Sequence, residues 1–141
     1  MEDMGQIHHS VASLRIFGDD LQPADISRLL NCKPIKAQAK GDVIRHASGR
    51  ERIAKFGGWW LDALRAAPED LDGQIKWLMA QVSDDLSVWQ GLRQSYDADI
   101  YCGLFMQSGN DGLSISPETM LALGKRGIEL GLDIYGPDDE D

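Results

Sequence analysis

The sequence contains little that a membrane span, a disulfide framework or a secretory signal would need. Its apolar runs are only a few residues long, whereas a helix needs about 20 apolar residues to cross a bilayer. The chain starts with Met1, Glu2 and Asp3, which is acidic where a signal peptide would be basic. The only cysteines, Cys32 and Cys102, do not form a Cys-x-x-Cys pair. We therefore expect a cytoplasmic protein with two free thiols and no membrane association.

The motifs that indicate catalysis or a bound cofactor are also missing. His8, His9 and His46 have no metal-ligand spacing. Ser108 precedes a glycine, but Met106 stands where a nucleophile elbow requires another glycine. The 15 glycines form no phosphate-binding pattern. The sequence therefore predicts no cofactor and no metal, and it favours a binding protein over an enzyme.

Positive charge is scarce overall but concentrated in one segment. The formal net charge is -9, with 23 acidic residues against 14 lysines and arginines. This balance disfavours binding to nucleic acid or to anionic membranes. Between Lys33 and Lys55, seven basic residues accompany two acidic ones, a local excess of +5 that leaves -14 for the remainder. We interpret this segment as a basic, solvated loop on an acidic body.

The length of 141 residues fits one domain with a single core. We expect a mobile leader at residues 1–9, one domain over residues 10–136 and an acidic tail at residues 137–141. Strand and helix signals follow one another in the order β-α-β-β-α-α-β-β-α-β. This order predicts a two-layer α+β fold, with helices on one face of a mostly antiparallel sheet. The first part of it suits a ferredoxin-like arrangement.

Individual elements are placed by periodicity and by turn or capping residues. Strands are expected at residues 10–17, 36–40, 57–62, 97–106, 113–115 and 129–135. Helices are expected to start near Pro23, Pro68, Leu86 and Pro117. Residues 43–55 carry no regular pattern and are left as a loop.

The strands at residues 97–106 and 129–135 have the clearest period-two alternation, which gives each strand an inner and an outer face. The inner faces are expected to carry Ile100, Cys102 and Leu104 from the first strand, and Leu130, Leu132 and Ile134 from the second. The helix that starts near Pro117 is expected to pack Met120, Leu121 and Leu123 inward.

The outer faces of the strands gather aromatic and charged side chains, which make a poor core. The candidate binding surface consists of Arg15, Phe17, Asp62, Asp99, Tyr101, Phe105, Asp133 and Tyr135, together with one of Trp59 and Trp60. Rings on a sheet hold planar ligands or protein loops, while nearby charges fix their orientation. The alternative is that the loop from Asp42 to Phe56, or a second copy of the protein, covers this face.

Three of these residues, Asp62, Asp99 and Asp133, are carboxylates on one face. Such a group can bind a metal ion or exchange protons with a substrate. The simpler interpretation is that they are surface aspartates on strands, some of them paired with Arg15. We prefer the simpler interpretation.

The chain resembles a bacterial family described as domain of unknown function 4279. The resemblance extends from Ser10 to Tyr135. It rests on Arg15-Ile16-Phe17-Gly18 followed by Leu21, Pro23 and Ile26, on Lys40-Gly41-Asp42, on Gly58-Trp59, and on Leu132-Asp133-Ile134-Tyr135. The resemblance implies a small bacterial α+β domain, and it implies no activity, substrate or cofactor.

Two functions fit these observations. The first is a non-enzymatic module that binds a protein, as an inhibitor or immunity-type factor would, through its acidic and aromatic sheet face. The acidic body would steer a basic partner toward it. The second is a small-molecule binder or enzyme with a pocket on the same face. Homodimerisation through this face is a further alternative.

Overall fold

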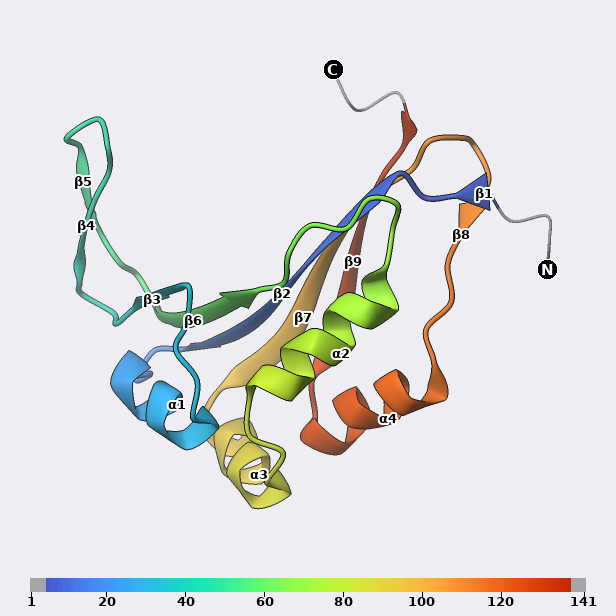
Figure 1. The fold of residues 1–141 in the computed structure, drawn as a ribbon. Helices are drawn as coiled ribbons and strands as arrows, with labels where there is room; N and C mark the ends of the chain where they lie inside the picture. Colours follow the sequence, from blue (N-terminus) through green and yellow to red (C-terminus); the bar gives the residue numbers. More distant parts are fainter. Residues whose placement is uncertain (1–4, 138–141) are drawn as a thin grey trace.

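The computed structural model describes residues 5–137, which form four helices and nine strands. The helices are α1 (Pro23–Leu30), α2 (Leu71–Gln81), α3 (Leu86–Ser95) and α4 (Pro117–Arg126). The strands are β1 (Gly5–Gln6), β2 (His9–Gly18), β3 (Lys36–Gln38), β4 (Val43–Arg45), β5 (Glu51–Ile53), β6 (Gly57–Asp62), β7 (Asp97–Phe105), β8 (Asp111–Gly112) and β9 (Glu129–Tyr135). Figure 1 shows how these elements follow one another.

A five-stranded sheet in the order β3-β6-β2-β7-β9 organises the molecule. Strand β6 is antiparallel to both β2 and β3, so β2 and β3 run parallel, with α1 connecting them and β6 lying between them. This is a split β-α-β unit, and with β7 on the other side of β2 it gives the predicted ferredoxin-like arrangement. Strand β9 follows α4 and pairs with β7 in parallel. The predicted α+β class is confirmed.

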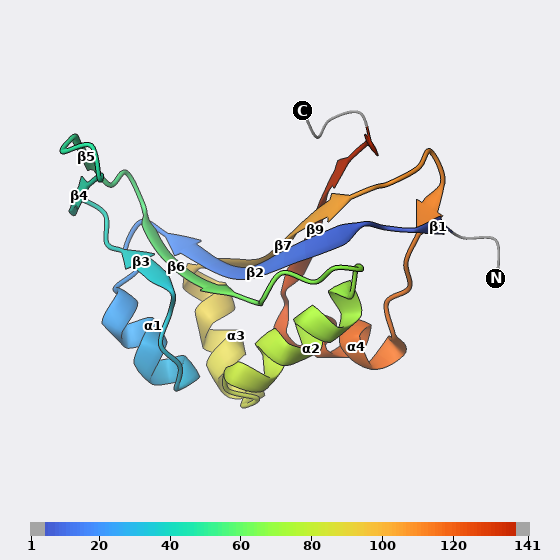
Figure 2. The same ribbon diagram turned by 45° about the horizontal axis from the view of Figure 1, so that its top comes forward.

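All four helices cover the same face of the sheet (Figure 2). Side chains on this helix face alternate with those on the other face because successive residues of a strand point to opposite sides. Leu14, Ile16, Trp59 and Ile100 are 0% exposed beneath the helices. Cys102 is a small core residue here, as predicted, and burial raises the pKa of its thiol to about 12.

Helix α4 begins and ends where its sequence predicts. The Ser116 hydroxyl accepts a hydrogen bond from the Thr119 N–H at 3.2 Å, and Pro117 occupies the first helical position. Gly127 ends the helix with a φ of 71°, a left-handed conformation that glycine adopts without strain. Helix α2, by contrast, begins at Leu71 rather than near Pro68, because Asp70 is its N-cap and bonds the Gly73 N–H.

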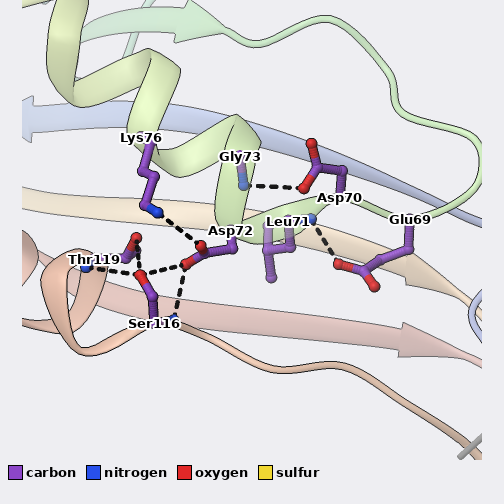
Figure 3. Close-up of polar contacts among 8 residues, drawn as sticks. All are labelled: Glu69, Asp70, Leu71, Asp72, Gly73, Lys76, Ser116 and Thr119. Carbon is purple, nitrogen blue, oxygen red and sulfur yellow. Dashed lines mark hydrogen bonds and ion pairs between the residues drawn. The ribbon is translucent and has the colours of Figure 1, made fainter.

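A polar cluster joins the first turns of α2 and α4 (Figure 3). The Asp72 carboxylate accepts hydrogen bonds from the Ser116 N–H at 2.9 Å and the Ser116 hydroxyl at 3.1 Å, and it pairs with Lys76. Partial burial, which alone would raise the pKa of Asp72, is outweighed by these contacts, so the pKa is lowered. The cluster fixes one helix against the other within the helix layer.

The structure places three elements differently from the sequence prediction, at the N-terminus, at residues 113–115 and at residues 43–55. The predicted boundary at Ser10 falls inside β2, and the folded part already includes β1, which pairs with β8, and Ile7, which is 4% exposed. Residues 1–4 of the predicted leader and residues 138–141 of the predicted tail lie outside the described residues. No strand forms at residues 113–115, and the short strand β8 lies just before them, at Asp111–Gly112. Residues 43–55, expected to be irregular, contain the β4–β5 hairpin.

Four aliphatic residues predicted to point into the core are exposed instead. Met120 and Leu121 on α4 are each 56% exposed, because Thr119, Leu123 and Arg126 form the buried side of that helix. Leu132 and Ile134 lie on the helix face of β9, but they are 49% and 56% exposed. Leu130 alone in this strand packs against the core. The helix layer therefore leaves the second half of β9 uncovered.

Candidate functional site

The face of the sheet opposite the helices, here called the open face, is covered by no helix (Figure 2). Its side chains come from alternate positions of β2, β3, β6, β7 and β9, the positions that face away from the core. The β4–β5 hairpin projects beyond the end of the sheet and does not lie over this face. From residues 42–56, Phe56 packs against this face, edge-on to Phe17 and Trp60. The alternative that the loop from Asp42 to Phe56 covers this face is therefore not seen among the described residues, apart from the contact of Phe56.

An ion pair lies at the centre of the open face, where β2 and β7 place Arg15 directly opposite Asp99. Nε of Arg15 donates to one Asp99 oxygen and a terminal nitrogen donates to the other, both at 2.8 Å. The guanidinium carbon also lies 4.8 Å from the centre of the Tyr101 ring and 5.1 Å from that of Phe17. Arg15 thus fixes two rings and one carboxylate at once.

A second polar group joins β7 to β9. The hydroxyls of Tyr101 and Tyr135 both donate to the same oxygen of Asp133, at 2.5 Å and 2.7 Å. These two hydrogen bonds, that of Tyr101 first, lower the pKa of Asp133. The bond to the carboxylate in turn raises the pKa of both tyrosines. At neutral pH the carboxylate is charged and holds both hydroxyls in fixed positions.

A row of rings crosses the other end of the open face. The register places His9 opposite Phe105 and Phe105 opposite Tyr135. The rings are stacked, with centres 4.1 Å apart for His9 and Phe105 and 4.7 Å apart for Phe105 and Tyr135. Such direct cross-strand neighbours are the contacts that stabilise a sheet surface. The three rings form one continuous aromatic strip across β2, β7 and β9.

At the opposite end, Phe17, Phe56 and Trp60 form a cluster of edge-to-face rings. Lys36 lies across from Trp60 on β3 with its ammonium 4.3 Å from the ring centre. Gly58 makes room for this arrangement, since a Cβ at that position would collide with the Trp60 ring. The Trp60 ring therefore lies close against the β6 backbone at Gly58.

A hollow of about 490 Å³ lies beside the central ion pair, on the side of β6 and β3. Arg15, Lys36, Trp60, Asp62 and Tyr101 are among its lining residues. The hollow thus offers two cations, one carboxylate and two rings to a bound group. A second hollow of about 510 Å³ lies where α3 meets the first residues of β7 and β9, and it is lined largely by charged groups such as Arg93, Asp97 and Glu129.

The open face brings together all of the predicted surface residues except Trp59. Trp59 is 0% exposed in the core, and its indole N–H donates to the Ser27 hydroxyl at 3.1 Å. Trp60 is the tryptophan of the open face. The sequence contained the deciding signal, because Asp62 was assigned to the outer face and a two-residue period then places Trp60 there as well.

Sequence reasoning missed three contributors to the open face. His9 was assigned to the leader because the start of β2 was set one residue too late. Phe56 falls in the predicted loop, and Lys36 falls in a predicted strand and in the basic segment but not in the predicted surface. Only His9 continues an alternation visible in the sequence, with Val11, Ser13 and Arg15.

The three carboxylates that the sequence groups on the open face each have a separate partner. Asp62 accepts from the Ser13 hydroxyl at 2.5 Å, Asp99 binds Arg15, and Asp133 binds the two tyrosines. Among residues 5–137, no group of three or more histidine, cysteine, aspartate or glutamate side chains is placed to hold a metal ion. These partners hold each of the three carboxylates in a fixed position.

No helix in the described part of the chain is both long and apolar enough to cross a membrane. The fold and the open face define an α+β domain with a ferredoxin-like core, a fifth strand and one aromatic sheet surface. A family model described as Domain of unknown function (DUF4279) matches residues 6–137. The chain belongs to this family, which confirms the resemblance seen in the sequence. No curated protein and no solved structure gave a significant match.

Proposed function

We propose that this protein is a non-enzymatic binding module whose open face engages another protein. The observation that carries the proposal is the aromatic and charged side chains held in fixed positions on a face that no described segment covers. The Arg15–Asp99 pair, the Tyr101–Asp133–Tyr135 group and the His9–Phe105–Tyr135 row fix those positions. Rings that are already oriented lose little conformational entropy on binding, so they suit recognition.

The charge distribution favours a basic partner. The net charge is -9, and the basic residues 45, 50 and 52 belong to the hairpin segment that projects beyond the end of the sheet. The acidic remainder therefore attracts a positively charged protein over a long range and raises its association rate. An inhibitor or immunity-type factor acts in this way. The proposal places the protein in the bacterial cytoplasm, where Cys32 and Cys102 would remain reduced.

The hollow beside Trp60 supports a second candidate, a small-molecule binder. Its volume of about 490 Å³ lies in the usual range for ligand sites. The Trp60 ring, with the Lys36 ammonium over it, suits a planar ligand that carries a negative charge. Both candidates use the open face, so they are separated by what is bound rather than by where it binds.

The test is a pull-down from the source lysate with tagged wild-type protein and two variants. Trp60→Ala with Tyr101→Ala removes rings from the open face, while Trp77→Ala removes a 45% exposed tryptophan from the helix side as a matched control. We expect one basic protein, in stoichiometric amount, to be retained by wild type and control and lost with the double variant. Its association rate should fall as salt is added.

The protein-binding proposal fails if no protein depends on the two rings. In that case the purified protein is denatured and the released small molecules are identified by mass spectrometry. A planar anion that is released from the wild type and from Trp77→Ala, but not from Lys36→Ala with Trp60→Ala, would establish the second candidate.

A further inference from the structure

The two edges of the five-stranded sheet differ sharply. Strand β3 at one edge has three residues, and the basic hairpin follows it. Strand β9 at the other edge has seven residues, and no described strand pairs with its outer side. Leu132 and Ile134 are 49% and 56% exposed on that strand. Natural proteins seldom leave a long edge strand with exposed aliphatic side chains unpaired, because such an edge attracts another strand.

The free backbone groups of β9 can be assigned from one hydrogen bond. The Met106 N–H donates to the Tyr135 carbonyl at 3.0 Å, so the backbone of Tyr135 points toward β7. Backbone groups alternate in direction along a strand. Those of Asp133 and Gly131 therefore also point toward β7, whereas those of Leu130, Leu132 and Ile134 point outward.

We propose that β9 pairs with β9 of a second copy of this chain, antiparallel and centred on Leu132. In this register Leu132 lies opposite Leu132 of the second copy, and Ile134 lies opposite its Leu130. All of these residues direct their backbone groups outward, and each such pair exchanges two hydrogen bonds. The exposed aliphatic side chains of the two copies also meet on the helix face.

Charge selects this register over its neighbours. A pairing centred on Asp133 would place two Asp133 carboxylates directly opposite each other, and a pairing centred on Gly131 would place Glu129 opposite Asp133. Like charges at directly opposed positions are destabilising. Centring on Leu132 places Asp133 opposite Gly131 and Tyr135 opposite Glu129, which brings no like charges together. The strand is thus complementary to itself in one register.

This pairing joins the two sheets into one, with both helix layers on the same side. The two open faces then become a continuous surface, with Tyr135 of each copy near the axis. The dimer does not depend on what the open face binds, so its test is independent of the proposed function.

The first experiment measures the mass of the untagged protein by sedimentation over a range of concentrations. The wild type is expected to form a dimer. Leu132→Lys with Ile134→Lys places like charges along the edge and should raise the dimer dissociation constant by about 100-fold or more. Val43→Lys with Ile53→Lys is the matched control, because these strand residues are 58% and 57% exposed in the distant hairpin.

The control should leave the dimer unchanged, and circular dichroism should show both double variants folded, since all four side chains are exposed. A wild type that stays monomeric at every concentration overturns the proposal. A dimer that persists in Leu132→Lys with Ile134→Lys overturns it as well, because the contact then lies elsewhere.

A second experiment tests the register through cysteine cross-linking in a Cys32→Ser background. Leu132→Cys places two thiols on the axis, where opposed Cα atoms are about 5.5 Å apart and within disulfide reach. Ile134→Cys is the control, because in this register two such residues are separated by more than about 12 Å. We expect a disulfide dimer from Leu132→Cys only. Cross-linking of Ile134→Cys alone would refute the register.

Discussion

The two faces of the sheet use the same strands but are ordered by different forces. On the helix face, Leu14, Ile16 and Ile100 are 0% exposed and aliphatic. On the open face, their sequence neighbours Arg15 and Tyr101 are half-buried and held by directional contacts. Burial of apolar surface orders the first face, and pairs of rings and charges order the second.

This difference separates stability from recognition. Burying one aliphatic side chain stabilises a fold by about 1.5–3 kcal/mol, whereas a partly solvated ion pair contributes about 1 kcal/mol or less. The helix face therefore supplies most of the free energy of unfolding. We therefore expect single substitutions on the open face to leave the domain folded, which makes this face suitable for tests of binding.

The largest expected effect comes from the helix face. Leu14→Ala removes a fully buried side chain in the middle of β2 and leaves a cavity. We expect the free energy of unfolding to fall by about 3 kcal/mol, measured by urea denaturation. Val11→Ala, a half-buried position of the same strand on the open face, is the comparison and should cost about 1 kcal/mol or less. Equal losses of unfolding free energy in the two variants would show that the open face is buried in solution.

A smaller effect is expected from the ion pair at the centre of the open face. The side chains of Arg15 and Asp99 are 30% and 21% exposed, and their contact is bidentate. A double-mutant cycle with Arg15→Ala and Asp99→Ala should give a coupling free energy of about 1 kcal/mol, because the geometry is well aligned and partly shielded from water. A coupling near zero would mean that water competes fully for both groups.

The strongly patterned elements were predictable from local signals. The strand that contains Leu14, the helix capped by Ser116 and Gly127, and the two faces of β7 follow from alternation and capping chemistry. The same alternation placed nearly all of the open-face residues. The pair Trp59 and Trp60 does not by itself say which ring faces the core, and only the outward position of Asp62 places Trp60 on the open face.

The remaining features depend on contacts that a single segment does not reveal. The hairpin at β4 and β5 has strands of only three residues, too short for alternation to be visible. Exposure of Leu132 and Ile134 depends on where the helix layer ends, which no property of β9 itself determines. The Asp133 carboxylate receives two hydroxyls only because parallel pairing brings Tyr101 beside β9.

Acid should reveal the role of Asp133. Hydrogen bonds from Tyr101 and Tyr135 lower its pKa in the folded protein. A carboxylate with a lowered pKa adds stability above its unfolded pKa of about 3.9, and that stability is lost as pH falls through the folded pKa. Tyr101→Phe with Tyr135→Phe should therefore lose less stability than the wild type between about pH 5 and pH 2 in urea denaturation.

Tyr96→Phe is the control for this comparison, because Tyr96 forms part of the helix-side packing and makes no contact with Asp133 among those that the structure shows. Its acid dependence should match that of the wild type. An unchanged acid dependence in the double phenylalanine variant would mean that other carboxylates account for the acid sensitivity.

The smallest effect is expected in the hairpin, where Arg45 and Glu51 form an ion pair with side chains 75% and 46% exposed. Both groups are well hydrated, so a double-mutant cycle with Arg45→Ala and Glu51→Ala should give a coupling of about 0.3 kcal/mol or less that vanishes at high salt. A value equal to that of Arg15 and Asp99 would show that shielding from water does not distinguish the two pairs. The two ion pairs would then contribute the same coupling free energy. The fixed side-chain positions on the open face would have to come from its ring contacts.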